Sequence, residues 1–245
     1  MNKNLLCLLI CLLLGGTLTA QSYAFGVKGG LTVGFQKWDL FEQDPSFKYH
    51  GIAFIETAPE DNAFAVFAQA GYHIKGSAIR NRNLINQNTG DVFRPPAREF
   101  LFKNVSLTAG AKQKFDYGSK DSKVYYMIGI RGDYTIGTNL EIYEQINNVF
   151  FIYPSNGGVR KFNYGVTVGG GMELPFSEYI SGLIEFSVNP DFSLQYQQPP
   201  LNGIYNPFTG QNTTLRERKI TNTTFELSVG LRFLVIVEYI DYHSW

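Results

Sequence analysis

Three histidines, His50, His73 and His243, are the residues of this chain best suited to act as catalytic bases. A Ser–His–acid hydrolase needs a serine within hydrogen-bond reach of the histidine. Ser77 follows His73 in the chain, but no recognisable hydrolase motif surrounds the two residues. We therefore assign no catalytic residue and expect a protein that is not an enzyme. A lipid-modifying hydrolase at His73 is the alternative.

The residues needed for a metal or cofactor site are too few or too scattered. Cys7 and Cys11 both lie within an apolar N-terminal leader, and three separated histidines do not form a ligand set. The run 169–171 is three glycines, but it lacks the Lys-Ser/Thr and the helix of a phosphate-binding loop. We expect no cofactor. The 21 Lys and Arg residues balance the 21 Asp and Glu residues, so the net charge gives no indication of a nucleic-acid partner.

The remaining chemistry-bearing residues are polar side chains that alternate with apolar ones. Buried charges must be paired or they cost several kcal/mol each. The structural interpretation is a mutually neutralising plug inside a barrel, and a narrow ion or proton path is the functional alternative. The residues of this predicted polar network are Lys28, Gln69, His73, Lys75, Lys112, Arg131, Asp133, Glu173, Glu185, Glu226 and Arg232.

Eight segments carry the alternation that is typical of β-strands. Two of them are weak, because Ile52, Phe54 and Ile55 fall on both faces of the second, and Asn189-Pro190 interrupts the seventh. The segments are about 25–35, 50–57, 64–75, 100–115, 124–136, 161–173, 180–196 and 225–233.

A closed barrel is the structure that these segments favour. No apolar run of helical length follows the first twenty residues, and a bilayer can be spanned only by helices or closed barrels. The face opposite the apolar residues is rich in Gly, Thr, Asn and Gln, which suits a narrow lumen. Apolar Phe67, Leu101, Tyr125 and Leu183 are expected on that side too. We predict an all-β, eight-stranded antiparallel up-and-down transmembrane barrel with a polar, filled lumen. A soluble periplasmic ligand-binding barrel with its apolar face inward is the alternative.

The connections alternate in length, which predicts the orientation of the barrel. Short ones lie at 59–62, 116–122 and 175–179, and long polar ones at about 36–48, 77–98, 138–160 and 197–220. In outer-membrane barrels the short turns are periplasmic, so both termini are expected in the periplasm. Residues 1–20 read as a signal peptide, 21–233 as the barrel, and 234–245 as a tail that could extend the last strand.

Three segments resemble the PorT-like outer-membrane β-barrel proteins of Bacteroidota, a Gram-negative phylum. These are the opening strand from Phe25 to Thr32, the glycine-rich strand from Tyr164 to Leu174, and the closing strand from Phe225 to Phe233. The resemblance implies a barrel of the cell outer membrane with a structural or accessory role, in a secretion or surface assembly. Expected partners are outer-membrane lipid, lipopolysaccharide, and a protein at the external loops or the tail after Phe233.

Overall fold

The structure is a computed structural model, and it describes residues 22–38, 42–58, 63–80, 83–85, 90–94, 96–118, 122–145, 147, 153–206 and 210–237. The predicted signal peptide, the short connection 59–62 and residues 238–245 of the predicted tail lie outside the described residues.

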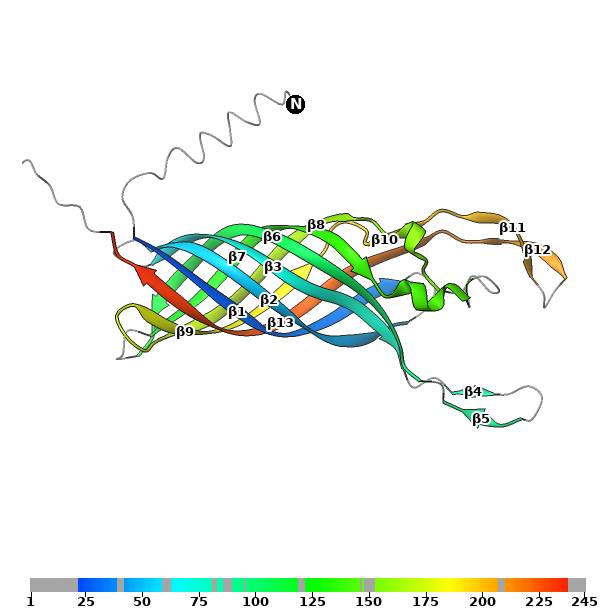
Figure 1. Cartoon of the computed structure of the whole chain (residues 1–245), viewed down its shortest axis with the longest axis horizontal. Helices are drawn as coiled ribbons and strands as arrows, with labels where there is room; N and C mark the ends of the chain where they lie inside the picture. The colour runs from blue at the N-terminus through cyan, green and yellow to red at the C-terminus, as the bar shows by residue number, and fades with distance from the viewer. Residues whose placement is uncertain are drawn as a thin grey trace, which may run out of the picture.

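Eight long antiparallel strands form a closed barrel (Figure 1). Each strand pairs with the next in chain order, and the first pairs with the last from Tyr23↔Val235 to Trp38↔Ile220. The predicted eight-stranded up-and-down barrel is confirmed. Its strands are β1 (Ser22–Trp38), β2 (Asp44–Ala58), β3 (Phe64–Ile79), β6 (Arg98–Asp116), β7 (Lys123–Thr138), β8 (Phe162–Pro175), β9 (Ile180–Pro190) and β13 (Arg218–Val235).

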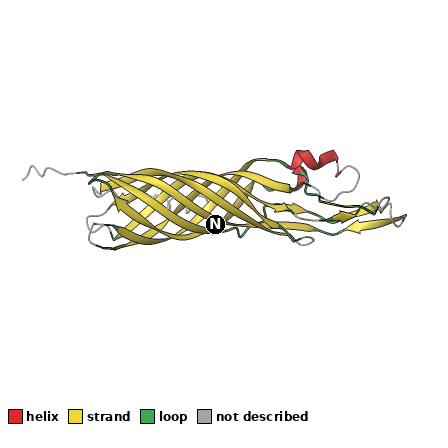
Figure 2. Ribbon diagram, turned by 90° about the horizontal axis from the view of Figure 1, so that it is seen from below, coloured by secondary structure: helices red, strands yellow, loops and turns green. Residues whose placement is uncertain are grey.

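The end of the barrel away from Ser22 and Val235 carries the longer connections, as Figures 1 and 2 show. We call it the outer end. No helix in the described part of the chain is long and apolar enough to cross a membrane. The elements at this end are the hairpins β4 (Leu84–Ile85)–β5 (Val92–Phe93) and β11 (Leu201–Asn206)–β12 (Gln211–Leu215), strand β10 (Tyr196–Gln198), and 3-10 turns η1 (Leu140–Tyr143) and η2 (Asn156–Gly158).

The expected long connection at 36–48 is wrong, because β1 continues to Trp38 and β2 begins at Asp44. Within the two strands, Gln36 and Ser46 point into the barrel interior, whereas Lys37 is exposed. The Gln36 side chain donates to Asn222 Oδ1 over 2.8 Å and accepts from the Ser77 hydroxyl over 2.6 Å. Side-chain hydrogen bonds across the lumen therefore keep a polar stretch in strand conformation.

The two faces of the wall differ in the way that the alternation predicts, with one correction. In the weak second segment apolar residues do fall on both faces, because Ile52 and Phe54 point inward and Ile55 is exposed on the outside. The Phe54 ring lies 5.2 Å from Lys112 Nζ, so it provides an aromatic face for a buried ammonium group. Placing Leu101 inside is wrong, because its neighbours Phe100 and Phe102 are the fully buried ones.

Glycine at Gly30 is required by the close approach of β1 and β13. A Cβ atom at this position would lie 2.0 Å from the carbonyl oxygen of Leu227. At Gly51 on β2, by contrast, a Cβ would meet nothing within 4 Å. The seam that closes the barrel therefore has no room for a side chain at Gly30.

We expect Gly30→Ala to lower the free energy of unfolding by about 1–3 kcal/mol, the usual cost of overpacking. Gly51→Ala is the matched control and should be neutral, since it meets no neighbour. Urea unfolding in lipid vesicles measures both. Equal stability of the two variants would contradict the close packing of the β1–β13 seam.

Candidate functional site: the ionic network of the barrel interior

All eleven predicted network residues are buried in the interior. They come from β1, β3, β6, β7, β8, β9 and β13, so seven of the eight barrel strands contribute. Eight of them form ion pairs between a Lys or Arg and a carboxylate, and these pairs gather into two clusters. His73 and Glu226 contact each other at 2.7 Å and form an ion pair only if His73 is protonated. Gln69 is buried but belongs to neither cluster in the described structure.

The cluster nearer the termini, which we call the basic cluster, centres on Glu56. One carboxylate oxygen of Glu56 lies 2.8 Å from Lys114 Nζ and 2.7 Å from Arg232 Nε, and the other accepts from Lys112 Nζ over 2.9 Å. A Glu173 oxygen also lies 2.7 Å from Lys114 Nζ, as an ion pair. One carboxylate on β2 thus holds cations from β6 and β13. Removing it would leave three buried cations short of a counter-ion.

A second carboxylate, Glu185, completes the basic cluster. Lys28 Nζ lies 2.5 Å from one of its oxygens, and the Tyr125 hydroxyl donates to the other over 2.8 Å. The Tyr125 ring in turn lies 4.8 Å from Lys112 Nζ. Phe67 and Met127 pack with Tyr125, so these apolar lumen residues surround the ions and limit the entry of water.

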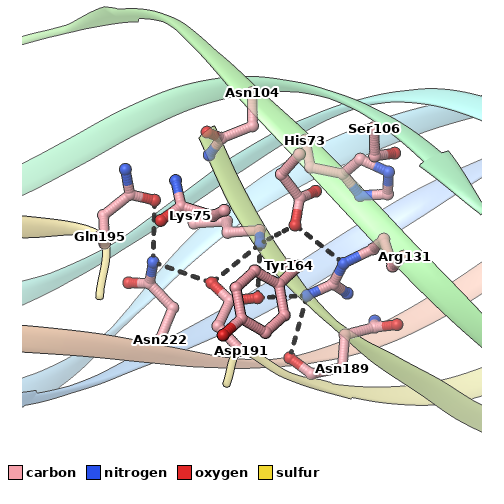
Figure 3. A network of polar contacts seen from close by, with 12 residues as sticks. His73, Lys75, Asn104, Ser106, Arg131, Tyr164, Asn189, Asp191, Gln195 and Asn222 are labelled. Carbon is pink, nitrogen blue, oxygen red and sulfur yellow. Dashed lines mark hydrogen bonds and ion pairs between the residues drawn. The ribbon is translucent and has the colours of Figure 1, made fainter. Parts of the chain in front are cut away.

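The cluster nearer the outer end, which we call the outer ion cluster, consists of two cations and two carboxylates in alternation (Figure 3). Lys75 Nζ donates to Asp133 over 2.8 Å and to Asp191 over 2.9 Å. Arg131 Nε donates to Asp133 over 3.0 Å, and its Nη2 donates to Asp191. Asn222 also donates to Asp191, over 3.2 Å. Each carboxylate is therefore shared between two cations.

Two stacked histidines belong to the same interior. His50 and His73 have ring centroids 5.7 Å apart and an interplanar angle of 12°. His73 Nδ1 lies 2.7 Å from Glu226, whereas the two nitrogens of His50 contact the hydroxyls of Thr32 at 2.9 Å and Ser228 at 2.8 Å. Hydroxyl groups both donate and accept, so they satisfy a neutral imidazole in either tautomer.

The charges of the ionic network, six cations and six anions, balance when both histidines are neutral, and Arg218 is a further buried cation outside the network. Sequence reasoning missed three of its members, Glu56, Lys114 and Asp191, and also the buried histidine His50. Glu56 and His50 lie in the weakly alternating second segment, and Asp191 follows Pro190. The network has as cations Lys28, Lys75, Lys112, Lys114, Arg131 and Arg232, and as anions Glu56, Asp133, Glu173, Glu185, Asp191 and Glu226.

An aromatic cap lies beyond the outer ion cluster, at the outer end of the barrel. Its rings pack closely, with centroid distances of 4.9 Å between Trp38 and Phe100 and 4.9 Å between Phe100 and Tyr143. The cap joins the wall to η1 and β10, and it consists of Trp38, Phe100, Phe102, Leu140, Tyr143, Tyr153, Tyr196 and Ile220. The ionic network and the aromatic cap together fill the described interior of the barrel. A filled interior suits a plug better than a wide solute channel.

The histidine–serine geometry does not support hydrolysis. Ser77 donates to Gln36 over 2.6 Å and to Gln43 over 3.0 Å, and it is not paired with His73. Among the described residues, the contact between a histidine and a serine is that of His50 with Ser228, which is buried, and Thr32 rather than an acid contacts the other nitrogen. Neither arrangement supplies an accessible, oriented nucleophile.

Glu56→Gln should lower the free energy of unfolding by about 3–5 kcal/mol, because it leaves buried cations uncompensated. Asp116→Asn is the matched control. The Asp116 side chain is 83% exposed and pairs with Lys123 at the rim, so its loss should cost less than about 1 kcal/mol. Urea titration in vesicles measures both values. A Glu56→Gln variant as stable as the control would contradict the central role of this carboxylate.

Comparisons with known proteins find similar solved structures. No protein-family model and no curated protein sequence matches the chain. The outer membrane protein OprG of Pseudomonas aeruginosa is 10% identical, with a TM-score of 0.46 over 89% of this chain and 98% of that one. Neisserial surface protein A is 14% identical, with a TM-score of 0.41 over 86% and 97% of the chains. Ail of Yersinia pestis is 12% identical, with a TM-score of 0.40 over 87% and 99%. At these identities the similarity concerns the path of the chain, not an activity.

Proposed function

We propose that this protein is a barrel of the cell outer membrane, where it has a structural or accessory role and does not form an open channel. The observation that carries the proposal is the apolar outer wall. Each barrel strand exposes large apolar side chains there, as illustrated by Val27, Leu31, Ile55, Val66, Leu107, Ile128, Ile130, Val168, Ile184, Phe186, Leu227 and Val229.

Aromatic residues are exposed near both ends of this wall. Phe25 and Phe233 stack at 5.5 Å near the termini, and Phe35 meets Phe225 at 5.4 Å nearer the outer end. Outer-membrane barrels carry such aromatic girdles at the two membrane interfaces. Monomeric soluble proteins rarely expose more than a few hundred Å² of apolar surface in one patch, because contact between apolar surface and water is unfavourable. Contact with lipid accounts for the continuous apolar surface of this wall.

The soluble alternative required the apolar face to point inward. The structure has the reverse arrangement, with ion pairs such as Lys28–Glu185 inside and residues such as Ile130 outside. Ion pairs and aromatic rings of the described residues occupy the part of the lumen that a small apolar ligand would need. We therefore do not propose ligand transport in the lumen.

The long outer connections support the accessory role. The hairpin β11–β12 extends beyond the barrel at the outer end (Figures 1 and 2), and its residues from Gln211 to Thr214 are exposed. With the termini in the periplasm, this hairpin would be presented outside the cell. The resemblance to PorT-like proteins of Bacteroidota favours a partner in a secretion or surface assembly. Lipopolysaccharide would surround the outer rim, where Arg98 and Lys103 could meet its phosphates.

Site-specific photo-cross-linking in intact cells tests the accessory role. A photoreactive phenylalanine analogue at Thr213 on β12 should give a discrete adduct with another protein. The same analogue at Phe176, an exposed residue in a turn at the terminus end, is the control and should not give that adduct. Adducts from Phe176 alone would contradict the orientation. Their absence at both positions would contradict the accessory role.

A further inference from the structure

We propose that one side of the outer wall binds a phosphorylated, acylated glycolipid, the lipid A part of lipopolysaccharide. The inference rests on the proposed outer-membrane role and deepens it, because it names one site and one class of lipid. The site is an apolar groove in the wall with a lysine at its outer end. We call it the wall groove. Its two adjoining parts, of about 850 and 550 Å³, share the lining residues Ala53 and Ala70.

Small side chains form the floor of the wall groove. Ala53 on β2 pairs with Ala70 on β3, and Ala68 on β3 pairs with Ala109 on β6. All four alanines are exposed on the outer face of the barrel. Leu107, the partner of Ala70 on β6, is exposed beside them and forms one side of the hollow. A hollow with an apolar floor and apolar sides suits a hydrocarbon chain.

The wall around β9, β13 and β1 has a different surface. Its exposed side chains are large and pack against one another, with ring centroids 6.3 Å apart for Phe186 and Phe225, and 5.4 Å apart for Phe225 and Phe35. The hollowed surface over β2, β3 and β6 is therefore a local feature and not a general property of this wall.

The outer end of the wall groove carries a cation. Lys103, Val105 and Leu107 share the outward face of β6, and Val105 lines the groove. Neighbours on one face of a strand are about 6.6 Å apart, so Lys103 lies one such step beyond Val105 toward the outer end. Its ammonium group is exposed, and its stem lies over Gly137 of β7, where a Cβ atom would be 3.8 Å from Lys103 Cδ.

Tyrosine side chains lie at the level between the floor and Lys103. Tyr72 on β3 and Tyr134 on β7 are the two register partners of Val105. Tyrosine is typical of the interface between hydrocarbon and head groups. From the middle of the wall outward, the site thus presents an apolar hollow, phenol groups and an ammonium group. The acyl chains, the sugar and the phosphate of lipid A follow one another in the same order.

The charge of Lys103 is not balanced by its surroundings. Lys48 and Arg80 both pair with Glu99, at 2.7 Å and 3.3 Å, and the backbone N–H of Arg80 donates to Asp44. Two cations therefore face two carboxylates in that group. Lys103 forms no ion pair with a residue that the structure describes. A phosphate oxygen would give it a charge-assisted hydrogen bond.

The orientation of the barrel identifies the lipid. With the termini in the periplasm, Lys103 is level with the outer leaflet, where the phosphorylated lipid is lipopolysaccharide. A phospholipid carries the same phosphate group but not the sugar. A second barrel is the other occupant to be tested, because small residues allow two membrane-embedded surfaces to approach closely.

Four variants separate the two parts of the site from the rest of the wall. Lys103→Gln removes the cation, and Ala70→Leu fills the floor of the groove. Lys37→Gln is the matched control for the first, because Lys37 is an exposed lysine near the outer end of β1. Ala111→Leu is the control for the second, since Ala111 follows Ala109 on the outward face of β6 and lies outside the wall groove.

Native mass spectrometry of the full-length protein, refolded in detergent, measures binding. The probes are purified lipid A, dephosphorylated lipid A and a phosphatidylglycerol. We expect one lipid A per barrel, and Lys103→Gln should weaken its binding about tenfold, the worth of one charge-assisted hydrogen bond. The same variant should leave the dephosphorylated form unchanged. Ala70→Leu should weaken both forms of lipid A, and the two controls should bind as the original protein does.

Four results would overturn the proposal. These are no binding of lipid A, equal binding of lipid A by Lys103→Gln and the original protein, binding of phosphatidylglycerol as tight as that of lipid A, and barrel dimers that Ala70→Leu disrupts in place of a lipid complex. Recovery of the heat-modifiable barrel from outer membranes is scored separately. A barrel that inserts without binding lipid A contradicts this proposal alone, whereas a barrel absent from outer membranes contradicts the proposed function.

Discussion

Charge neutrality inside a closed wall is the constraint on which the rest of this structure depends. A barrel with an apolar exterior must place its polar residues inside, where an unpaired charge costs several kcal/mol. The ionic network meets this requirement with six cations and six anions, and Arg218, near the outer end, is a further buried cation outside the network. Its pairs join residues far apart in sequence, such as Lys28 with Glu185 and His73 with Glu226. Because a register slip of one residue would turn these charges toward the outer wall, the network also fixes the strand register.

The alternation of residue types was sufficient to predict the barrel and much of its interior. It placed residues such as Arg131 and Glu226 inside because their strands keep a strict two-residue period. It failed where that period is disturbed by local chemistry. Phe54 is an apolar residue that belongs inside because it faces a buried ammonium group, and Asp191 reaches the network from just beyond Pro190. Partners across a lumen depend on register, which a single strand's sequence does not contain.

The interior of the outer end is packed differently from the part of the barrel that holds the ionic network. Aromatic rings fill the interior there, and the ion pairs of that end, such as Lys48–Glu99, are partly exposed. Phe100 contacts both the wall residue Trp38 and the connection residues Tyr143 and Tyr153. The cap therefore links the rigid barrel to the connections that would face the outside. This arrangement gives the outer connections a fixed base, from which the hairpin β11–β12 projects.

The most direct test of the account is whether the outer wall contacts lipid. Ile130, in the middle of β7, and Ile142, in η1 at the outer end, are 73% and 65% exposed. Arginine at each position can be compared by the fraction of unboiled, faster-migrating barrel recovered from outer membranes. The account predicts that Ile130→Arg costs about 2–4 kcal/mol of insertion and depletes this form, as for charges on the lipid face, while Ile142→Arg has little effect. Equal recovery of both variants, or folded soluble protein for both, would contradict it.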